Sequence, residues 1–136
     1  MEETDDIMST LLAAQRDFVR GDAATFTELW SRGADVTIMG AFGGYEQGWA
    51  TVGPRLKWAA SQFSEGTFTM ELLSSVASQD FLSTVTIERT EAKLGGGSER
   101  VLQELRVTQV FRREADGWKI VHRHADPLRP TAPPST

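Results

Sequence analysis

The segment at residues 106–128, RVTQVFRREADGWKIVHRHADPL, carries the side chains best suited to chemistry. In a closed interior, Arg123 could bind a carboxylate, an enolate or a phosphate-like oxygen, with the amide of Gln109 beside it. A buried guanidinium is costly unless it is paired, so we expect Arg123 to have a partner. That partner could be a ligand oxygen, which indicates a binding site. It could also be an internal carboxylate, Glu88 or Glu46, which would only tie the sheet together.

Alternate residues of the same segment, His122, His124 and Asp126, would share one face of a strand and so could ligate zinc. The same spacing is typical of histidines at a dimer interface or in hydrogen-bonded pairs, and we predict neither a metal nor a cofactor. If His122 faced the interior instead, it would be the best general base available, because its pKa lies near working pH.

The loop length of this predicted hairpin decides which side chains face inward, because a shift of one residue turns every side chain to the other face. Asp116-Gly117 between two alternating segments is a strong hairpin signal. A two-residue loop sets Gln109 opposite His124. A three-residue loop, with Gly117 in the left-handed conformation, sets Gln109 opposite Arg123.

The longer loop is favoured, because it gathers one apolar face around Gln109 and Arg123. The apolar members of that face would be Leu105, Val107, Phe111, Val121 and Ala125. This register also pairs Phe111 with Val121. It leaves Trp118 and Ile120 on the more polar face, which counts against it.

Further candidates lie outside the hairpin. Glu88, on a predicted strand, would be an acid of raised pKa if buried and a solvated charge if exposed. Tyr45 and Glu46 lie in a glycine-rich segment, residues 40–48, that should border a cavity. There the phenol could donate to a ligand and the carboxylate could act as a base, or the segment is a solvated turn. The side chains predicted to line the pocket are Phe42, Tyr45, Trp49, Trp58, Phe63, Val107, Phe111 and Val121.

The composition limits the classes of function. A chain of 136 residues with 40% hydrophobic content can form one domain with a substantial core. A net charge of −5 disfavours nucleic acid or an anionic membrane as a partner. The chain has no cysteine, which excludes disulfides and thiolate chemistry. The acidic N-terminus and the absence of a membrane-spanning apolar run predict a soluble, cytoplasmic protein.

Apolar periodicity predicts three helices followed mainly by strands. The helices are expected at about 4–20, 23–32 and 49–63, and the strands at 35–39, 68–72, 81–92, 101–111 and 118–126. Helices on one face of a curved, four-stranded antiparallel meander make an α+β domain over residues 1–128. The other face of such a sheet needs cover, so we predict a homodimer. The proline-rich residues 129–136 are expected to be a disordered tail.

The order of these segments resembles the nuclear transport factor 2-like superfamily, most closely its SnoaL-like and ketosteroid isomerase-like bacterial proteins. The motifs that carry the resemblance are ADVTI, PRL.WA..F and the terminal GWKIVHRHAD, and the similarity spans about residues 5–128. It implies a cone, in which a strongly curved antiparallel sheet wraps around three N-terminal helices and leaves a cavity at one end. Superfamily members include isomerases, cyclases, dehydratases, epoxide hydrolases and binding modules, so this fold does not name a reaction.

The residues of the steroid isomerases do not carry over. Their carboxylate base corresponds to Gly40, their oxyanion tyrosine to Ala14 and their protonated aspartate to Gln109. Steroid isomerisation by that mechanism needs a base and two acidic donors, so it is not expected here. The kinase association domains of the superfamily have the same hairpin loop length and line their cavity with arginines on these strands. This likeness favours the register that pairs Gln109 with Arg123.

Two functions follow as hypotheses. In the first, the cone binds a small oxygenated metabolite and performs cofactor-free proton transfer, as an isomerase, cyclase or dehydratase. Arg123 and Gln109 would stabilise the oxyanion of a carboxylate or enolate ligand, and His122, Glu88 or Glu46 would move the proton. In the second, the protein is a non-catalytic ligand-binding or dimeric assembly domain.

Overall fold

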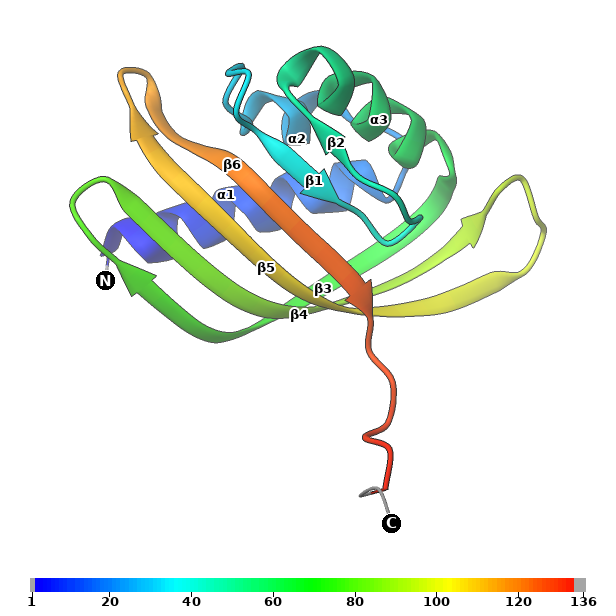
Figure 1. The fold of residues 1–136 in the computed structure, drawn as a ribbon. Helices are drawn as coiled ribbons and strands as arrows, with labels where there is room; N and C mark the ends of the chain where they lie inside the picture. The colour runs from blue at the N-terminus through cyan, green and yellow to red at the C-terminus, as the bar shows by residue number, and fades with distance from the viewer. Residues whose placement is uncertain (1, 134–136) are drawn as a thin grey trace.

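Six strands form one curved, open sheet in the order β2-β1-β6-β5-β4-β3, with three helices packed against it (Figure 1). The computed structural model describes residues 2–133. The elements are α1 (Glu2–Phe18), α2 (Ala24–Glu28), β1 (Thr37–Met39), β2 (Glu46–Gln47), α3 (Trp49–Ser61), β3 (Phe63–Ala77), β4 (Phe81–Leu94), β5 (Arg100–Glu114) and β6 (Gly117–Pro127). The predicted α+β cone is therefore confirmed.

The sheet contains more than the predicted antiparallel meander. β3 to β6 form that meander, but β1 pairs in parallel with β6, and β2 pairs with β1 at the sheet edge. The strand predicted at residues 35–39 is β1, but its parallel pairing with β6 and the two-residue β2 were not predicted, because so short a strand carries no periodic signal.

The second helix is shorter than predicted, because its expected last turn joins the sheet. The carbonyl of Leu29 accepts from the amide of Ile120 at 2.7 Å, and the amide of Ser31 donates to the carbonyl of Ile120 at 3.0 Å. Trp30 forms an isolated bridge with the same residue. The amides of Leu29 and Trp30 still donate to carbonyls three residues earlier, and pairing with β6 replaces the helical hydrogen bonds from Ser31 onward.

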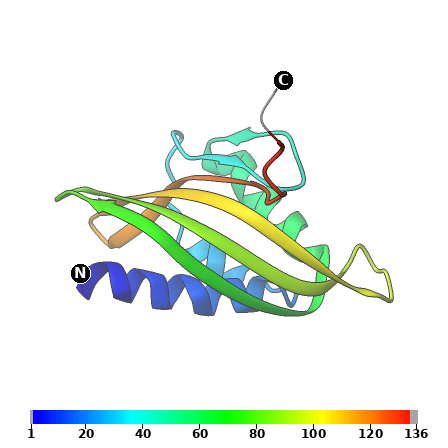
Figure 2. The ribbon, with the colours of Figure 1, turned by 90° about the horizontal axis from the view of Figure 1, so that it is seen from below.

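The core lies between α1 and the concave face of the sheet (Figure 2). Leu11, Ala14 and Phe18 form the buried stripe of α1. At the end of the helix the chain approaches β3 so closely that a side chain at Gly66 would collide with the carbonyl of Val19. Only glycine fits there, which holds the helix end against the sheet.

The β5–β6 hairpin has the favoured register at its centre. Gln109 lies opposite Arg123, the pairing that the three-residue loop predicted, but that loop is wrong: Glu114 pairs with Gly117, so the loop is the two residues Ala115-Asp116. Nearer the turn, a bulge leaves Val121 unpaired and sets Phe111 opposite Ile120, so the predicted pairing of Phe111 with Val121 is wrong. The extra residue turns Ile120 into the core, where it is fully buried. In a regular hairpin Ile120 would lie on the more polar face, and the bulge puts this apolar side chain into the core instead.

The opposite face of β4, β5 and β6 is free of helices within residues 2–133, and these strands cross in front of α1 in Figure 1. Within this described part, no helix is long and apolar enough to cross a membrane; the cytoplasmic location stays a prediction. Of the predicted tail, residues 129–133 form no helix or strand, and residues 134–136 lie outside the described residues.

Candidate functional site

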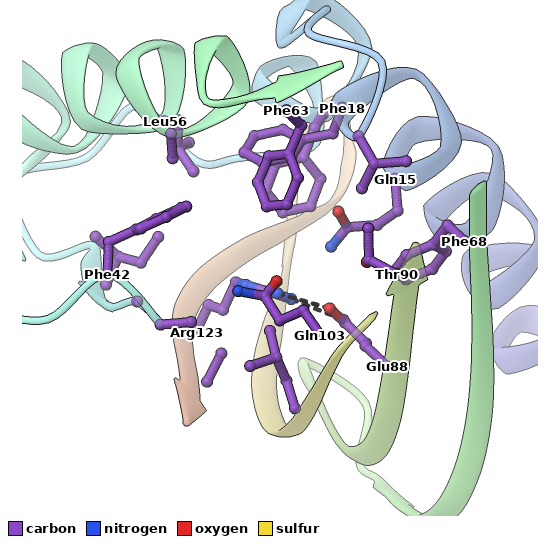
Figure 3. Close-up of a pocket in the computed structure, with 18 residues that line it drawn as sticks. Gln15, Phe18, Phe42, Leu56, Phe63, Phe68, Glu88, Thr90, Gln103 and Arg123 are labelled. Atoms are coloured by element: carbon purple, nitrogen blue, oxygen red, sulfur yellow. Dashed lines mark hydrogen bonds and ion pairs between the residues drawn. The ribbon is translucent and has the colours of Figure 1, made fainter. Parts of the chain in front are cut away.

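A cavity lies between the helices, the loop at residues 40–42 and the concave face of the sheet (Figure 3). Its volume is about 60 Å³, which is room for a few water molecules or a small organic group. Most of the wall is apolar, and its larger side chains are Phe18, Phe26, Phe42, Leu56, Phe63 and Phe68.

The polar part of the wall is a buried ion pair. Arg123 on β6 reaches across β5 to Glu88 on β4, with Nη1 donating to Oε2 at 2.9 Å and Nη2 to Oε1 at 2.7 Å. Nη1 also donates to Oε1 of Gln109 at 3.2 Å. Arg123 is 8% exposed and Glu88 is 2% exposed. Two parallel charge-assisted bonds fix both side chains in one geometry.

Strand alternation explains this arrangement. On β4, Thr84, Thr86, Glu88 and Thr90 all point to the buried face. Because β5 lies between β4 and β6, an inward residue of the middle strand, Gln109, lies beside the pair. Of the two carboxylates that the sequence offered to Arg123, the structure selects Glu88.

Arg123 keeps donors to spare. A guanidinium has five N–H groups, and three of those in Arg123 donate to Glu88 and Gln109. The remaining two, on Nε and Nη2, have no hydrogen-bond partner among the described residues. The guanidinium also lies 5.8 Å from the ring centre of Phe26, which covers it on the helix side. The site can therefore donate to an oxygen while its own charges are balanced.

The histidines lie on the other face of the sheet. His122 is half-buried, and its Nδ1 lies 2.7 Å from the Thr37 hydroxyl. Burial, and secondarily the nearby charge of His124, hold the pKa of His122 below its usual value. Asp126 accepts two hydrogen bonds from Arg106. Within residues 2–133, no group of three or more potential metal ligands is assembled.

Phe42 and Phe63 are the predicted pocket-lining residues that line the cavity, and their rings pack 5.8 Å apart. Phe42 also lines a smaller neighbouring cavity of about 30 Å³ that includes Tyr45 and Glu46. Tyr45 is 71% exposed. Trp58 packs edge-on against Phe42 at 5.2 Å. Phe42 thus stands between two cavities.

The other predicted lining residues lie elsewhere. Arg32 covers the ring of Trp49, which borders a groove beside α2. Val107 packs in a small separate cluster with neighbouring strand residues. Phe111 faces the first half of α1, and Val121 is half-buried at the bulge.

Sequence reasoning missed three polar residues of the cavity wall, Gln15, Thr90 and Gln103. A signal for the first was available. Gln15 lies four residues after Leu11 and three before Phe18, so it shares the buried stripe of α1. A glutamine on such a stripe needs a hydrogen-bond partner or has a functional role.

A family model described as a SnoaL-like domain matches residues 7–129. The chain is 22% identical to a candidate dehydratase of the nuclear transport factor 2-like family from Streptomyces avermitilis, with a TM-score of 0.78 and coverage of 94% of this chain and 95% of that one.

A nuclear transport factor 2-like protein from Salmonella enterica gives 16% identity, a TM-score of 0.81 and coverage of 96% and 92%. A ketosteroid isomerase-like protein from Erwinia carotovora gives 16% identity and a TM-score of 0.70, with coverage of 91% of this chain and 95% of that one. No curated protein matches the sequence. At these identities the solved structures establish the fold alone.

Proposed function

The chain belongs to the SnoaL-like domain family, and from that premise we propose that it binds a small, partly apolar, oxygenated molecule in the cavity beside Arg123. The apolar wall would hold the body of the ligand, and the free N–H groups of Arg123 would donate to its oxygen.

One observation carries this proposal: the Arg123–Glu88 pair lies in the wall of an otherwise largely apolar cavity. Buried ion pairs contribute little net stability, because desolvation offsets their attraction. Apolar side chains of similar volume would fill the same space as well. In the cavity wall, however, the pair offers oriented donors that need no reorganisation when a ligand arrives.

Cofactor-free proton transfer is a second candidate for the same cavity. It is favoured by Glu88, a carboxylate in the lining beside a group that could stabilise an oxyanion. The Streptomyces neighbour described as a candidate dehydratase agrees with such chemistry. Glu88 already accepts from Arg123 through both oxygens. By the resemblance described above, Gly40, Ala14 and Gln109 stand where the steroid isomerases have their catalytic residues, so that mechanism is not available here. We therefore place binding first and isomerisation, cyclisation or dehydration second.

A homodimer through the uncovered sheet face is the proposed assembly. Val85, Ile87 and Val110 lie on that face and are only half-buried in the single chain. Sedimentation should give twice the chain mass for the wild type, and Ile87→Asp should reduce it to the monomer. A monomeric wild type at micromolar concentration would contradict this assembly.

A fragment screen by thermal shift tests binding at this cavity. Ala59→Leu on α3 should fill the cavity, since Ala59 lies in its wall. Ala50→Leu makes the same change at an exposed position of the same helix. Fragments should raise the Tm of the wild type and of Ala50→Leu but not of Ala59→Leu. Equal shifts in all three proteins would place binding elsewhere.

Arg123→Ala separates the site from a purely internal pair. Loss of fragment binding in the folded variant supports the proposal. If Arg123→Ala destabilises the fold but binds fragments as the wild type does, the pair only ties the sheet together. For the catalytic candidate, Glu88→Gln should abolish turnover of an enolisable ligand while binding remains.

A further inference from the structure

We infer that the cavity selects an uncharged ligand with one hydrogen-bond acceptor, a carbonyl oxygen, held between Gln15 of α1 and Arg123 of β6. This inference rests on the ligand-binding function proposed above and names the chemical class of the ligand.

Charge balance is the first argument. Within residues 2–133, Arg123 and Glu88 are the ionisable side chains in the lining, and their charges cancel at 2.7 and 2.9 Å. A ligand carboxylate would add an unbalanced negative charge beside Glu88 in an apolar enclosure. A ligand ammonium would add an unbalanced positive charge beside Arg123. Either must be stripped of water without a free counter-charge, which is costly. A neutral molecule avoids this cost.

Gln15 supplies the second argument. Its side chain is 3% exposed, and its Nε2 is buried without a hydrogen-bond partner among the described residues. Figure 3 shows its amide extending from α1 into the cavity toward Arg123. A buried donor left unsatisfied is destabilising. A ligand oxygen between the two side chains can accept from Gln15 Nε2 and from an unused N–H of Arg123, which satisfies donors from both walls.

The cavity walls determine the size and polarity of the rest of the ligand. Beyond this polar end, Phe18, Leu56 and Phe63 present apolar surface. The cavity volume of about 60 Å³ limits the ligand to a short or branched chain of a few heavy atoms, because a cavity of about 150 Å³ is the size that holds a benzene ring. The expected class is a small ketone, aldehyde, ester or amide.

Three probes of nearly the same shape test the inference: acetone, acetate and isobutene. They present a neutral carbonyl, an anion and no acceptor, respectively. Calorimetry or ligand-observed NMR at pH 7 should show acetone binding at least about tenfold more tightly than acetate. It should also bind several-fold more tightly than isobutene, as one hydrogen bond provides.

Gln15→Leu should remove the preference for acetone over isobutene. Gln47→Leu, the same change at an exposed position outside both cavities, should leave it intact. Ligand-free Gln15→Leu should also melt at a higher temperature than the wild type, because an unsatisfied buried donor is replaced by an apolar group. Weaker binding with greater stability is a combination that a merely structural glutamine would not give.

The outcomes separate this inference from the function on which it rests. If acetate binds as tightly as acetone, or if Gln15→Leu keeps the preference over isobutene, charge and acceptor selection are refuted while ligand binding stands. If none of the three probes binds the wild type, the binding function and the inference both fail.

Discussion

Two arginine–carboxylate pairs of similar geometry lie on opposite faces of the sheet. Inside, Arg123 bonds Glu88 at 2.7 and 2.9 Å, and outside, Arg106 bonds Asp126 at 2.9 and 3.0 Å. The inner side chains are 10% and 3% exposed, whereas the outer ones are 62% and 40% exposed. The two pairs have the same chemical groups and differ in their exposure to solvent.

This difference decides what each pair can do. In water the outer charges are screened, and either partner can be lost with little consequence. In the interior each charge depends on the other, and a ligand that enters meets dipoles already oriented. A candidate site therefore comes from the alternation of strand residues, which places one pair in each environment.

The largest expected effect comes from breaking the inner pair. Glu88→Ala leaves the Arg123 guanidinium buried and uncompensated, so the free energy of unfolding should fall by about 3–5 kcal/mol. Urea denaturation at 25 °C measures this change. A loss below about 1 kcal/mol would mean that water reaches Arg123 and that the two faces do not differ.

The double variant Glu88→Leu/Arg123→Met is the matched control. It removes both charges and keeps apolar volume, so it should recover most of the stability that Glu88→Ala loses. It should still fail to bind fragments. Stability without binding would separate the two consequences of burying the pair.

A smaller effect is expected from the inward threonines. The hydroxyl of Thr86 is fully buried without a hydrogen-bond partner among the described residues. Thr86→Val should therefore raise the free energy of unfolding by about 1 kcal/mol. Thr108→Val, at an exposed position of the outer face, should change it little. Denaturation curves of both variants test the comparison, and destabilisation by Thr86→Val would show that the hydroxyl is satisfied.

The centre of the inner face was predictable from the sequence. A strand period of two puts Gln109 and Arg123 on the inner face and His122 outside. The pairing of Gln109 with Arg123 itself depends on the bulge, because the two-residue loop alone would set Gln109 opposite His122. The cost of a buried guanidinium also required a carboxylate partner, and Glu88 was one of two candidates. Period and electrostatics act locally or pairwise, so the sequence contains them.

The remainder depends on packing across distant elements. The bulge at Val121 forms because Ile120 gains burial in the core, and a periodic pattern cannot reveal that gain. The parallel pairing of β1 with β6 needs the path of the chain through α2. Gln15 became a candidate ligand-binding residue only when the fold placed it and Arg123 in the lining of the same cavity.

His122 gives a pH-dependent effect on the outer face. Burial and the charge of His124 lower the pKa of His122 below 6.5, so the unfolded chain takes up a proton before the folded protein does. Stability from this group is therefore present above pH 6.5 and is lost as the pH falls toward the lowered folded pKa. The Tm of His122→Asn should fall less than that of the wild type between pH 7.5 and about 5.5. His124→Asn, which removes only the secondary cause, should keep most of the dependence. If the Tm of the wild type and of His122→Asn fell equally over this pH range, the assignment of the pH dependence to His122 would be wrong.

The smallest effect is expected at the outer pair, where the comparison is most exposed to failure. The hydrogen bond from Arg106 holds the pKa of Asp126 below its usual range, so the carboxylate is charged at pH 7 and contributes until the pH falls through that lowered value. Asp126→Asn should nevertheless leave the free energy of unfolding unchanged within error at 0.15 M salt, and lower it slightly at about 0.01 M, since salt screens exposed charges. Glu88→Gln should cost far more and show no such salt dependence. If Asp126→Asn cost as much as Glu88→Gln at both salt concentrations, bidentate geometry rather than burial would set the strength of these pairs. The inner pair would then lose its distinction as a candidate site.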